Sequence, residues 1–244
     1  MGTFMVAETV TMNVPISAVI GRAHRGAVAI VGDMPRTARS IVAGHCYHLI
    51  NRGNNRARVF HDAHDFYAFL ALISEGQERF SLPILALCLM PNHLHIVARP
   101  NADDDLSRWT QWLFTTHVRR YHKKYGTAGR IWQGRFKAFV IQEDSHLLTV
   151  LRYVERNALR AGLAAKAEQW RWGSLHWRDA KSPKVPLCPS PVRLPTNWVQ
   201  WVNTPQTAQE LEAIRSCVNR QRPFGEAGWV RRQWGHSRPA KSPP

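Results

Sequence analysis

Two histidines, His93 and His95, are separated by one residue within the stretch ILALCLMPNHLHIVARP, residues 84–100. Side chains alternate between the two faces of a strand, so these histidines share one face while Leu94 and Ile96 occupy the other. Neutral imidazole is a common ligand of divalent metals, and a strand holds such a pair rigidly. The pattern therefore indicates a metal site. The spacing alone leaves a second interpretation open, that of two unconnected surface histidines.

A second candidate pair lies in the helical pattern of residues 143–160, which Gly162 ends. Tyr153 and Asn157 are four residues apart, so on a helix they emerge together at the edge of the buried face. A tyrosine hydroxyl, with a pKa near 10, is a poor nucleophile at neutral pH. Helix tyrosines are also more often core residues than nucleophiles. Position alone therefore does not separate Tyr153 from the other four tyrosines.

The net charge of the chain indicates which class of molecule it binds. Lys and Arg number 33 against 17 Asp and Glu, a net charge of +16. Such an excess indicates a polyanion, and nucleic acid before membrane, because no basic amphipathic helix stands out and no apolar run reaches the length of a membrane span. The N-terminal segment lacks the pattern of a secretory signal. Four cysteines without C-x-x-C spacing indicate neither a zinc knuckle nor a disulfide framework. Together these features predict a cytoplasmic, nucleoid-associated protein.

Several basic side chains are candidates for contact with nucleic-acid phosphates. A helix ending near Tyr125 carries four of them in its last turns, where they form either a solvated face or a phosphate-binding one. A strand over 134–142 alternates two more with apolar residues. The full candidate set is Arg52, Arg119, Arg120, Lys123, Lys124, Arg135, Lys137, Arg156, Arg160, Arg222, Arg231 and Arg232.

The elements that must position these residues follow a recognisable order. The pattern predicts a strand over 45–53, a helix capped by Asp62, a hairpin over 84–99, a helix from 103 to 125, and a strand over 134–142. Three consecutive aspartates at 103–105 suit the positive end of that helix better than a metal site. The order β-α-β-β-α-β predicts an α+β, ferredoxin-like fold, the split β-α-β arrangement, whose antiparallel sheet has its helices on one face.

Composition divides the chain into three parts. Residues 1–33 show no clean period, which predicts a disordered extension before a natural start at Met34. Residues 34–162 hold the patterned core. Residues 163–244 form a basic tail that contains seven of the ten tryptophans and a proline-rich stretch. Those tryptophans could stack nucleic-acid bases or cap a small core, and the sequence leaves both interpretations open.

Three motifs resemble a known family. MPNHLHIVARP, IWQGRFKAFVI and LRYVERNALRAGL, in this order and spacing, are similar to the REP-associated tyrosine transposases, single-tyrosine relatives of the HUH transposases. The resemblance covers roughly 34–180, and the RPFG segment of the tail more loosely. It implies that His93 and His95 are metal ligands, that Tyr153 is the nucleophile, and that Asn157 is a third ligand. The family commonly has proline where this chain has Ala158, a departure that removes no reactive group.

The resemblance also implies an activity. The expected protein is a metal-dependent single-stranded DNA endonuclease and strand transferase that cuts at hairpin-forming repeats through a 5′-phosphotyrosine intermediate. Mg²⁺ or Mn²⁺ is the expected cofactor, because phosphate chemistry is oxygen-rich. The expected partner is single-stranded DNA with hairpin repeats, and no membrane is expected as a partner. The expected oligomeric state is a monomer or a homodimer.

Two other functions remain as alternatives. A non-catalytic nucleic-acid-binding module on the same sheet would ordinarily show aromatic pairs on its central strands, and residues 84–90 have none. A rolling-circle initiator of the same superfamily would carry a helicase region or a second tyrosine near Tyr153, and the sequence has neither.

Overall fold

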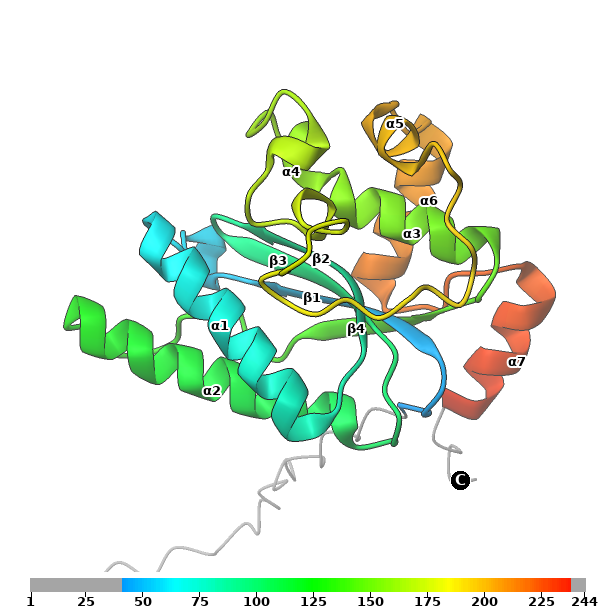
Figure 1. The fold of residues 1–244 in the computed structure, drawn as a ribbon. Coiled ribbons are helices and arrows are strands. Elements are labelled where there is room, and N and C mark those ends of the chain that lie inside the picture. Colours follow the sequence, from blue (N-terminus) through cyan, green and yellow to red (C-terminus); the bar gives the residue numbers. More distant parts are fainter. Residues whose placement is uncertain (1–40, 238–244) are drawn as a thin grey trace, which may run out of the picture. The chain divides into compact units, whose positions relative to one another are not determined.

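The computed structural model describes residues 41–237, drawn in Figure 1. The expected extension over 1–33 and the expected start at Met34 lie outside this range. The elements in chain order are β1 (Cys46–Arg52), η1 (Asn54–Arg56), α1 (Ala63–Phe80), β2 (Ile84–Met90), β3 (His93–Ala98), α2 (Asp105–Tyr125), β4 (Lys137–Ile141), α3 (Ser145–Glu155), α4 (Asn157–Arg160), η2 (Ala167–Gln169), η3 (Ser174–His176), α5 (Trp198–Asn203), α6 (Ala208–Arg220) and α7 (Ala227–Ser237).

The four strands form one antiparallel sheet in the order β2-β3-β1-β4. Pro91 and Asn92 make the tight turn between β2 and β3, as their residue types predict. The register places Arg52 of β1 opposite His93, and Ile50 opposite His95. Directly paired residues share a face, so Arg52 and both histidines lie on the same side of the sheet. The α+β class and the predicted antiparallel sheet are confirmed.

Helices cover both faces of this sheet (Figure 1). α1 and α2 bury Leu49 and Ile96 on one face, whereas α3 and the C-terminal helices bury Val97 and Phe139 on the other. The expectation that all helices lie on one face was wrong. Every residue of β2 is buried, which requires a covered surface on each side of the strand.

The helix ends follow local chemistry in part. The side chain of Asp62 accepts a hydrogen bond from the Asp65 amide, 2.9 Å away, and caps α1 as predicted. At α2 the three aspartates lie at the N-terminal end of the helix, as expected, but no aspartate side chain caps it. Instead, the Asp105 carboxylate accepts hydrogen bonds from the backbone amides of Asn101 and Ala102 and so stabilises the preceding turn. No helix among residues 41–237 is long and apolar enough to cross a membrane.

The segment that follows α4 packs against the core. Trp172, Trp177 and Trp198 are buried, so these three indole rings belong to the core rather than to a surface that could stack bases. Phe224 is also buried, and its backbone pairs with both Val140 and Gln142 beside β4. This pairing covers part of the exposed edge of the sheet.

One buried histidine leads us to predict how the stability of the fold depends on pH. His117 of α2 accepts a hydrogen bond from Trp132 Nε1, 3.2 Å away. Burial, opposed by Asp65 and assisted by Arg120, lowers the pKa of His117 to about 4. Between pH 6.5 and 4 the unfolded chain therefore binds a proton that the folded chain excludes, so this site costs about 3 kcal/mol of stability as pH falls through that window.

The measurement is urea unfolding at pH 7 and pH 4.5 for the parent and for His117→Gln. We expect the stability difference between the two pH values to shrink in the variant. An unchanged difference would show that His117 titrates normally in the folded chain.

Candidate active site

The histidine pair lies on β3 with both side chains on the α3 side of the sheet. The ring centroids of His93 and His95 are 5.1 Å apart. His93 Nδ1 hydrogen-bonds Asn92 Oδ1 at 2.7 Å, and His95 Nδ1 hydrogen-bonds His48 Nε2 at 2.9 Å. These bonds engage the Nδ1 atoms and leave each Nε2 for another partner. A hydrogen bond on one ring nitrogen commonly orients the other toward a metal.

Both imidazoles are held in the neutral form. Burial, with smaller contributions from Arg52 and Arg160, lowers the pKa of His93 to about 4. Burial and the neighbouring His48 lower the pKa of His95 well below its usual range. Neutral imidazole is the form that binds metal, so the pair needs no deprotonation near neutral pH.

Tyr153 and Asn157 come from the opposite layer. The Tyr153 ring lies 5.7 Å from that of His95, centroid to centroid, and 6.0 Å from that of His48. Asn157 hydrogen-bonds His93, which opposes the lowering of the histidine pKa. Its Nδ2 atom is buried without a hydrogen-bond partner in the described structure. The four residues that the resemblance singles out therefore converge on one point between β3 and the helical layer.

The helical turn that carries these groups is nearly continuous. Arg156, between α3 and α4, keeps right-handed helical angles of φ −81° and ψ −6°. The spacing of four residues therefore still places Tyr153 and Asn157 on one stripe. Ala158 is buried and continues the helix, so its replacement of the family's usual proline leaves the stripe intact.

A buried carboxylate, which the sequence interpretation missed, anchors this stripe. Glu155 is 2 % exposed and accepts hydrogen bonds from Ser174 Oγ and Trp198 Nε1, both at 2.7 Å. Arg178 pairs with the same carboxylate. These partners follow Glu155 by 19 to 43 residues. The segment after α4 therefore fixes the helix that bears Tyr153 and Asn157.

We expect Glu155→Ala to lower the free energy of unfolding by about 3–5 kcal/mol, because it leaves the Arg178 guanidinium half-buried and unpaired. Asp104→Ala is the control, since its pair with Arg108 is 3.4 Å long and more than 60 % exposed on both sides. That variant should lose less than about 1 kcal/mol. Urea unfolding measures both, and equal losses would mean that the Glu155 cluster does not anchor the helix.

The basic candidates fall into different environments. Arg52 is exposed beside His93, while Arg160 lies against the Tyr153 ring. Lys124 and Arg156 have internal partners: Lys124 pairs with Asp62 and Asp65, and the Arg156 guanidinium donates to carbonyls at the end of α5. The candidates exposed on α2, on β4 and the loop before it, and on α7 are Arg119, Arg120, Lys123, Arg135, Lys137, Arg231 and Arg232. Arg222, just after α6, is exposed and has an interaction partner.

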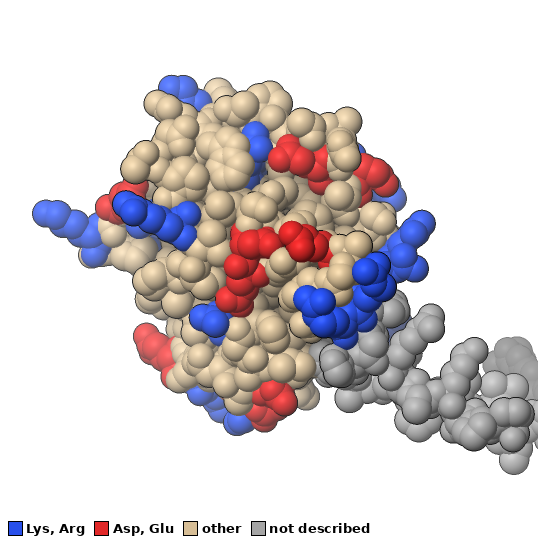
Figure 2. Space-filling view, turned by 90° about the vertical axis from the view of Figure 1, so that its right-hand side faces the viewer, with Lys and Arg blue, Asp and Glu red and all other residues tan. Residues whose placement is uncertain are grey.

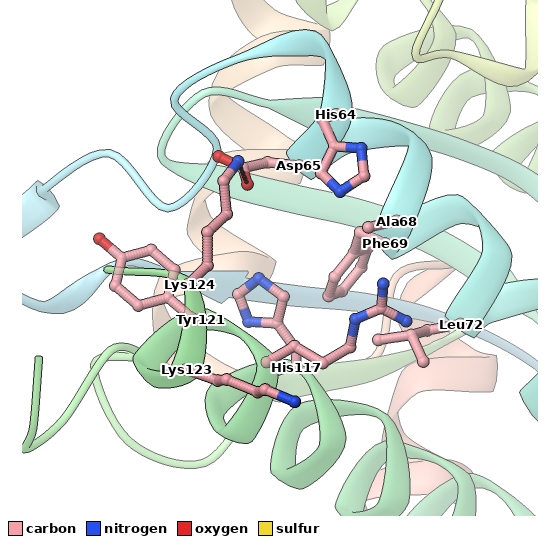
Figure 3. A pocket seen from close by; sticks show the side chains of 10 residues that line it. His64, Asp65, Ala68, Phe69, Leu72, His117, Tyr121, Lys123 and Lys124 are labelled. Carbon is pink, nitrogen blue, oxygen red and sulfur yellow. Dashed lines mark hydrogen bonds and ion pairs between the residues drawn. The ribbon is translucent and has the colours of Figure 1, made fainter. Parts of the chain in front are cut away.

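A separate hollow lies between α1 and α2 (Figure 3). Its volume is about 530 Å³, and its lining includes His64, His117 and Tyr121. Arg120 and Lys123 also line it, and both are exposed. Since these helices cover the sheet face away from the histidine pair, the hollow is not part of the candidate active site.

The face that carries α7 is not uniformly basic. Figure 2 shows acidic side chains across the centre of this face, with Lys and Arg side chains nearer its margins. The net positive charge is therefore distributed unevenly over the surface. Contacts with phosphate on this face would depend on particular arginines rather than on a general positive potential.

Comparisons with known proteins agree with the motifs. The family model described as "Transposase IS200 like" matches residues 41–157. A Haemophilus influenzae protein that carries the name REP-associated tyrosine transposase is 29% identical over 129 residues, which cover 48% of this chain and 72% of the relative. All four candidate residues at the centre of the site fall within the family match.

Two solved structures are also similar in part. A REP-associated tyrosine transposase bound to a REP hairpin has a TM-score of 0.49 and 18% identity, over 64% of this chain and 93% of that one. A transposase from Deinococcus radiodurans has a TM-score of 0.34 and 20% identity, over 49% and 95%. The ordered motifs and the sequence matches make this chain similar to the IS200-like transposases over residues 41–157, and to a REP-associated tyrosine transposase over 129 residues.

Proposed function

We propose that this protein cuts single-stranded DNA beside a hairpin through a covalent link to Tyr153. The observation that supports this most directly is the convergence of Tyr153 and Asn157 from one helical stripe on the histidine pair of β3. A nucleophile next to a set of neutral nitrogen and amide-oxygen ligands suits phosphoryl transfer. The other described tyrosines have no ring contact with either histidine of the pair.

The donor set fits a divalent metal. The family is generally metal-dependent. His93 Nε2, His95 Nε2 and Asn157 Oδ1 would hold the ion, and the unpartnered Nδ2 of Asn157 is consistent with an amide whose oxygen faces a ligand. When bound, the ion supplies Lewis-acid polarisation of a non-bridging phosphate oxygen. Two nitrogens and one oxygen leave positions for phosphate and water, and we propose Mg²⁺ or Mn²⁺.

The residues account for strand transfer rather than simple hydrolysis. Tyr153 Oη attacks the scissile phosphorus, the bond from phosphorus to O3′ breaks, and O3′ takes a proton to leave a free 3′-OH. The downstream strand stays attached as a 5′-phosphotyrosine. This ester conserves the energy of the phosphodiester, so a second 3′-OH can reverse the step and join a new strand.

The binding partner we propose is a hairpin formed by a repeat in single-stranded DNA. The name of the Haemophilus influenzae relative supports a REP sequence as that repeat. Exposed basic side chains flank the site, with Arg52 beside His93 and with Arg135 and Lys137 where β4 begins. They suit phosphate contacts along a strand that enters at this end of the sheet.

The test uses a labelled single-stranded hairpin from the flanks of the gene, incubated with the full chain and Mn²⁺ or Mg²⁺. We expect a shortened strand with a 3′-OH and a covalent protein–DNA adduct that survives denaturing electrophoresis. Tight hairpin binding without cleavage in either metal would favour the non-catalytic binding module instead.

The tail offers a further prediction about recognition. Arg231 and Arg232 are exposed on α7, whereas Phe224 and Glu226 contact the β4 edge. Replacing both arginines with glutamine therefore tests the effect of their charge on DNA binding without disturbing the packing. If both contact phosphates, the slope of log K against log salt should fall by about 1.4 to 1.8, at 0.7 to 0.9 per contact.

Arg79→Gln with Arg108→Gln is the matched control, because it removes the same charge near the C-terminal end of α1 and the N-terminal end of α2. Its salt slope should stay near that of the parent. Equal salt slopes in all three proteins would mean that the exposed residues of α2, rather than those of α7, recognise the DNA.

A further inference from the structure

Three arginines recur every four residues along the helical segment that bears Tyr153: Arg152, Arg156 and Arg160. Two of them serve the packing. The Arg152 guanidinium donates to the carbonyls of Trp201, Thr204 and Pro205, and that of Arg156 to the carbonyls of Val202 and Asn203. Both therefore satisfy the otherwise open carbonyls at the C-terminal end of α5.

Arg160 has a different environment. Its guanidinium carbon lies 4.2 Å from the centroid of the Tyr153 ring. Its Nη1 atom is buried and has no hydrogen-bond partner among the described residues, and no carboxylate forms an ion pair with it there. The nearby Glu155 is already engaged by Arg178, Ser174 and Trp198. A buried cationic donor without an acceptor is costly, so a site that keeps one commonly has an anion to receive it.

Arg160 also shares a side of the helix with the candidate active-site residues. Its spacing of seven residues from Tyr153 and three from Asn157 keeps all three on one stripe. The unsatisfied donor therefore belongs to a side chain that lies against the ring of the proposed nucleophile.

We propose that Arg160 is a catalytic residue that donates from its guanidinium to a non-bridging oxygen of the scissile phosphate. The inference rests on the proposed function, since it assumes attack by Tyr153. As the Tyr153 Oη–phosphorus bond forms and the phosphorus–O3′ bond breaks, negative charge grows on the non-bridging oxygens, and a fixed cation there lowers the barrier. Arg160 stays protonated throughout. The proton lost by Tyr153 and the proton gained by O3′ exchange with water.

A packing role for Arg160 predicts different behaviour. If the guanidinium only stacks on the Tyr153 ring, its removal would misplace the nucleophile for every substrate alike. If it neutralises the phosphate, its removal should matter little once the phosphate carries no charge. A substrate with a methylphosphonate at the scissile position makes this distinction, because a methyl group replaces one charged oxygen.

The experiment compares the parent, Arg160→Ala, Arg160→Lys and the control Arg79→Ala in single-turnover cleavage of hairpin DNA with phosphodiester or methylphosphonate at the cut site. On phosphodiester we expect Arg160→Ala to be slower by about 100-fold or more, Arg160→Lys to recover part of the rate, and Arg79→Ala to match the parent. On methylphosphonate the deficit of Arg160→Ala should shrink to a few-fold. Hairpin binding by all four proteins should agree within a few-fold, which also verifies that they are folded.

An equal deficit on both substrates, or a parental rate for Arg160→Ala on phosphodiester, would overturn the assignment of Arg160 and leave Tyr153 as the proposed nucleophile. Absence of any covalent adduct in the parent would overturn the proposed function itself. The two failures are therefore distinguishable in one set of reactions.

Discussion

A Tyr153→Phe protein is expected to bind hairpin DNA as the parent does and to form no covalent adduct. The substitution removes one oxygen, and the ring keeps its packing in the core next to His48 and His95. Loss of a nucleophile lowers turnover by a factor on the order of 10⁶, so cleavage should fall below detection. The measurements are denaturing electrophoresis for the adduct and a hairpin-binding titration.

Tyr47→Phe is the matched control for that experiment. Tyr47 is also buried, and its hydroxyl hydrogen-bonds the backbone of Val42. Its loss removes a comparable oxygen from the other face of the sheet, so cleavage should persist at the parental rate. An adduct in Tyr153→Phe would assign the chemistry to another residue and leave Tyr153 as a core side chain.

The sequence predicted those features that depend on local pattern. Alternation placed His93 and His95 on one face, and the four-residue spacing placed Tyr153 beside Asn157. The order of strands and helices was sufficient to predict the antiparallel sheet. The two side-chain placements follow from backbone geometry within about ten residues, which periodicity reports directly.

Other features depend on partners far along the chain, and periodicity does not report them. In the sequence Glu155 looks like an ordinary helix residue, yet its hydrogen-bond partners come from residues 174–198. Lys124 reads as one of a basic cluster, yet Asp62 and Asp65 neutralise it. A charged residue that a distant segment buries has no local signal, so only the tertiary structure separates packing arginines from those left for a ligand.

Coverage of both sheet faces also bears on the alternative functions. A nucleic-acid-binding module of the RNA-recognition type stacks bases on an open sheet surface. Here α1 and α2 cover one face, and α3 with the C-terminal helices covers the other. Under the proposed function we therefore expect DNA to bind at the end of the sheet, where Arg52 and His93 lie opposite each other, rather than across its surface.

His95→Ala is the second variant for which we expect an essentially complete loss of activity. His95 is 4 % exposed, and its Nδ1 is held by His48, so its Nε2 is fixed in the position of the proposed ligand. Residues that only hydrogen-bond a metal ligand are worth about 10–100-fold in metal affinity, and loss of a direct ligand should cost about 100-fold or more. Mn²⁺ titration by calorimetry measures this independently of DNA, and cleavage should disappear in parallel.

EDTA added to the parent protein should have the same effect on cleavage, and Mn²⁺ in excess should restore it. His176→Ala is the control, because His176 is exposed and bonded to the Glu168 carbonyl, so it should change neither metal affinity nor rate. Full cleavage in EDTA would show that the pair has a structural role only. Normal Mn²⁺ binding by an inactive His95→Ala would instead mean that His95 acts on the DNA or on Tyr153, since the ring already lies 5.7 Å from that of the tyrosine.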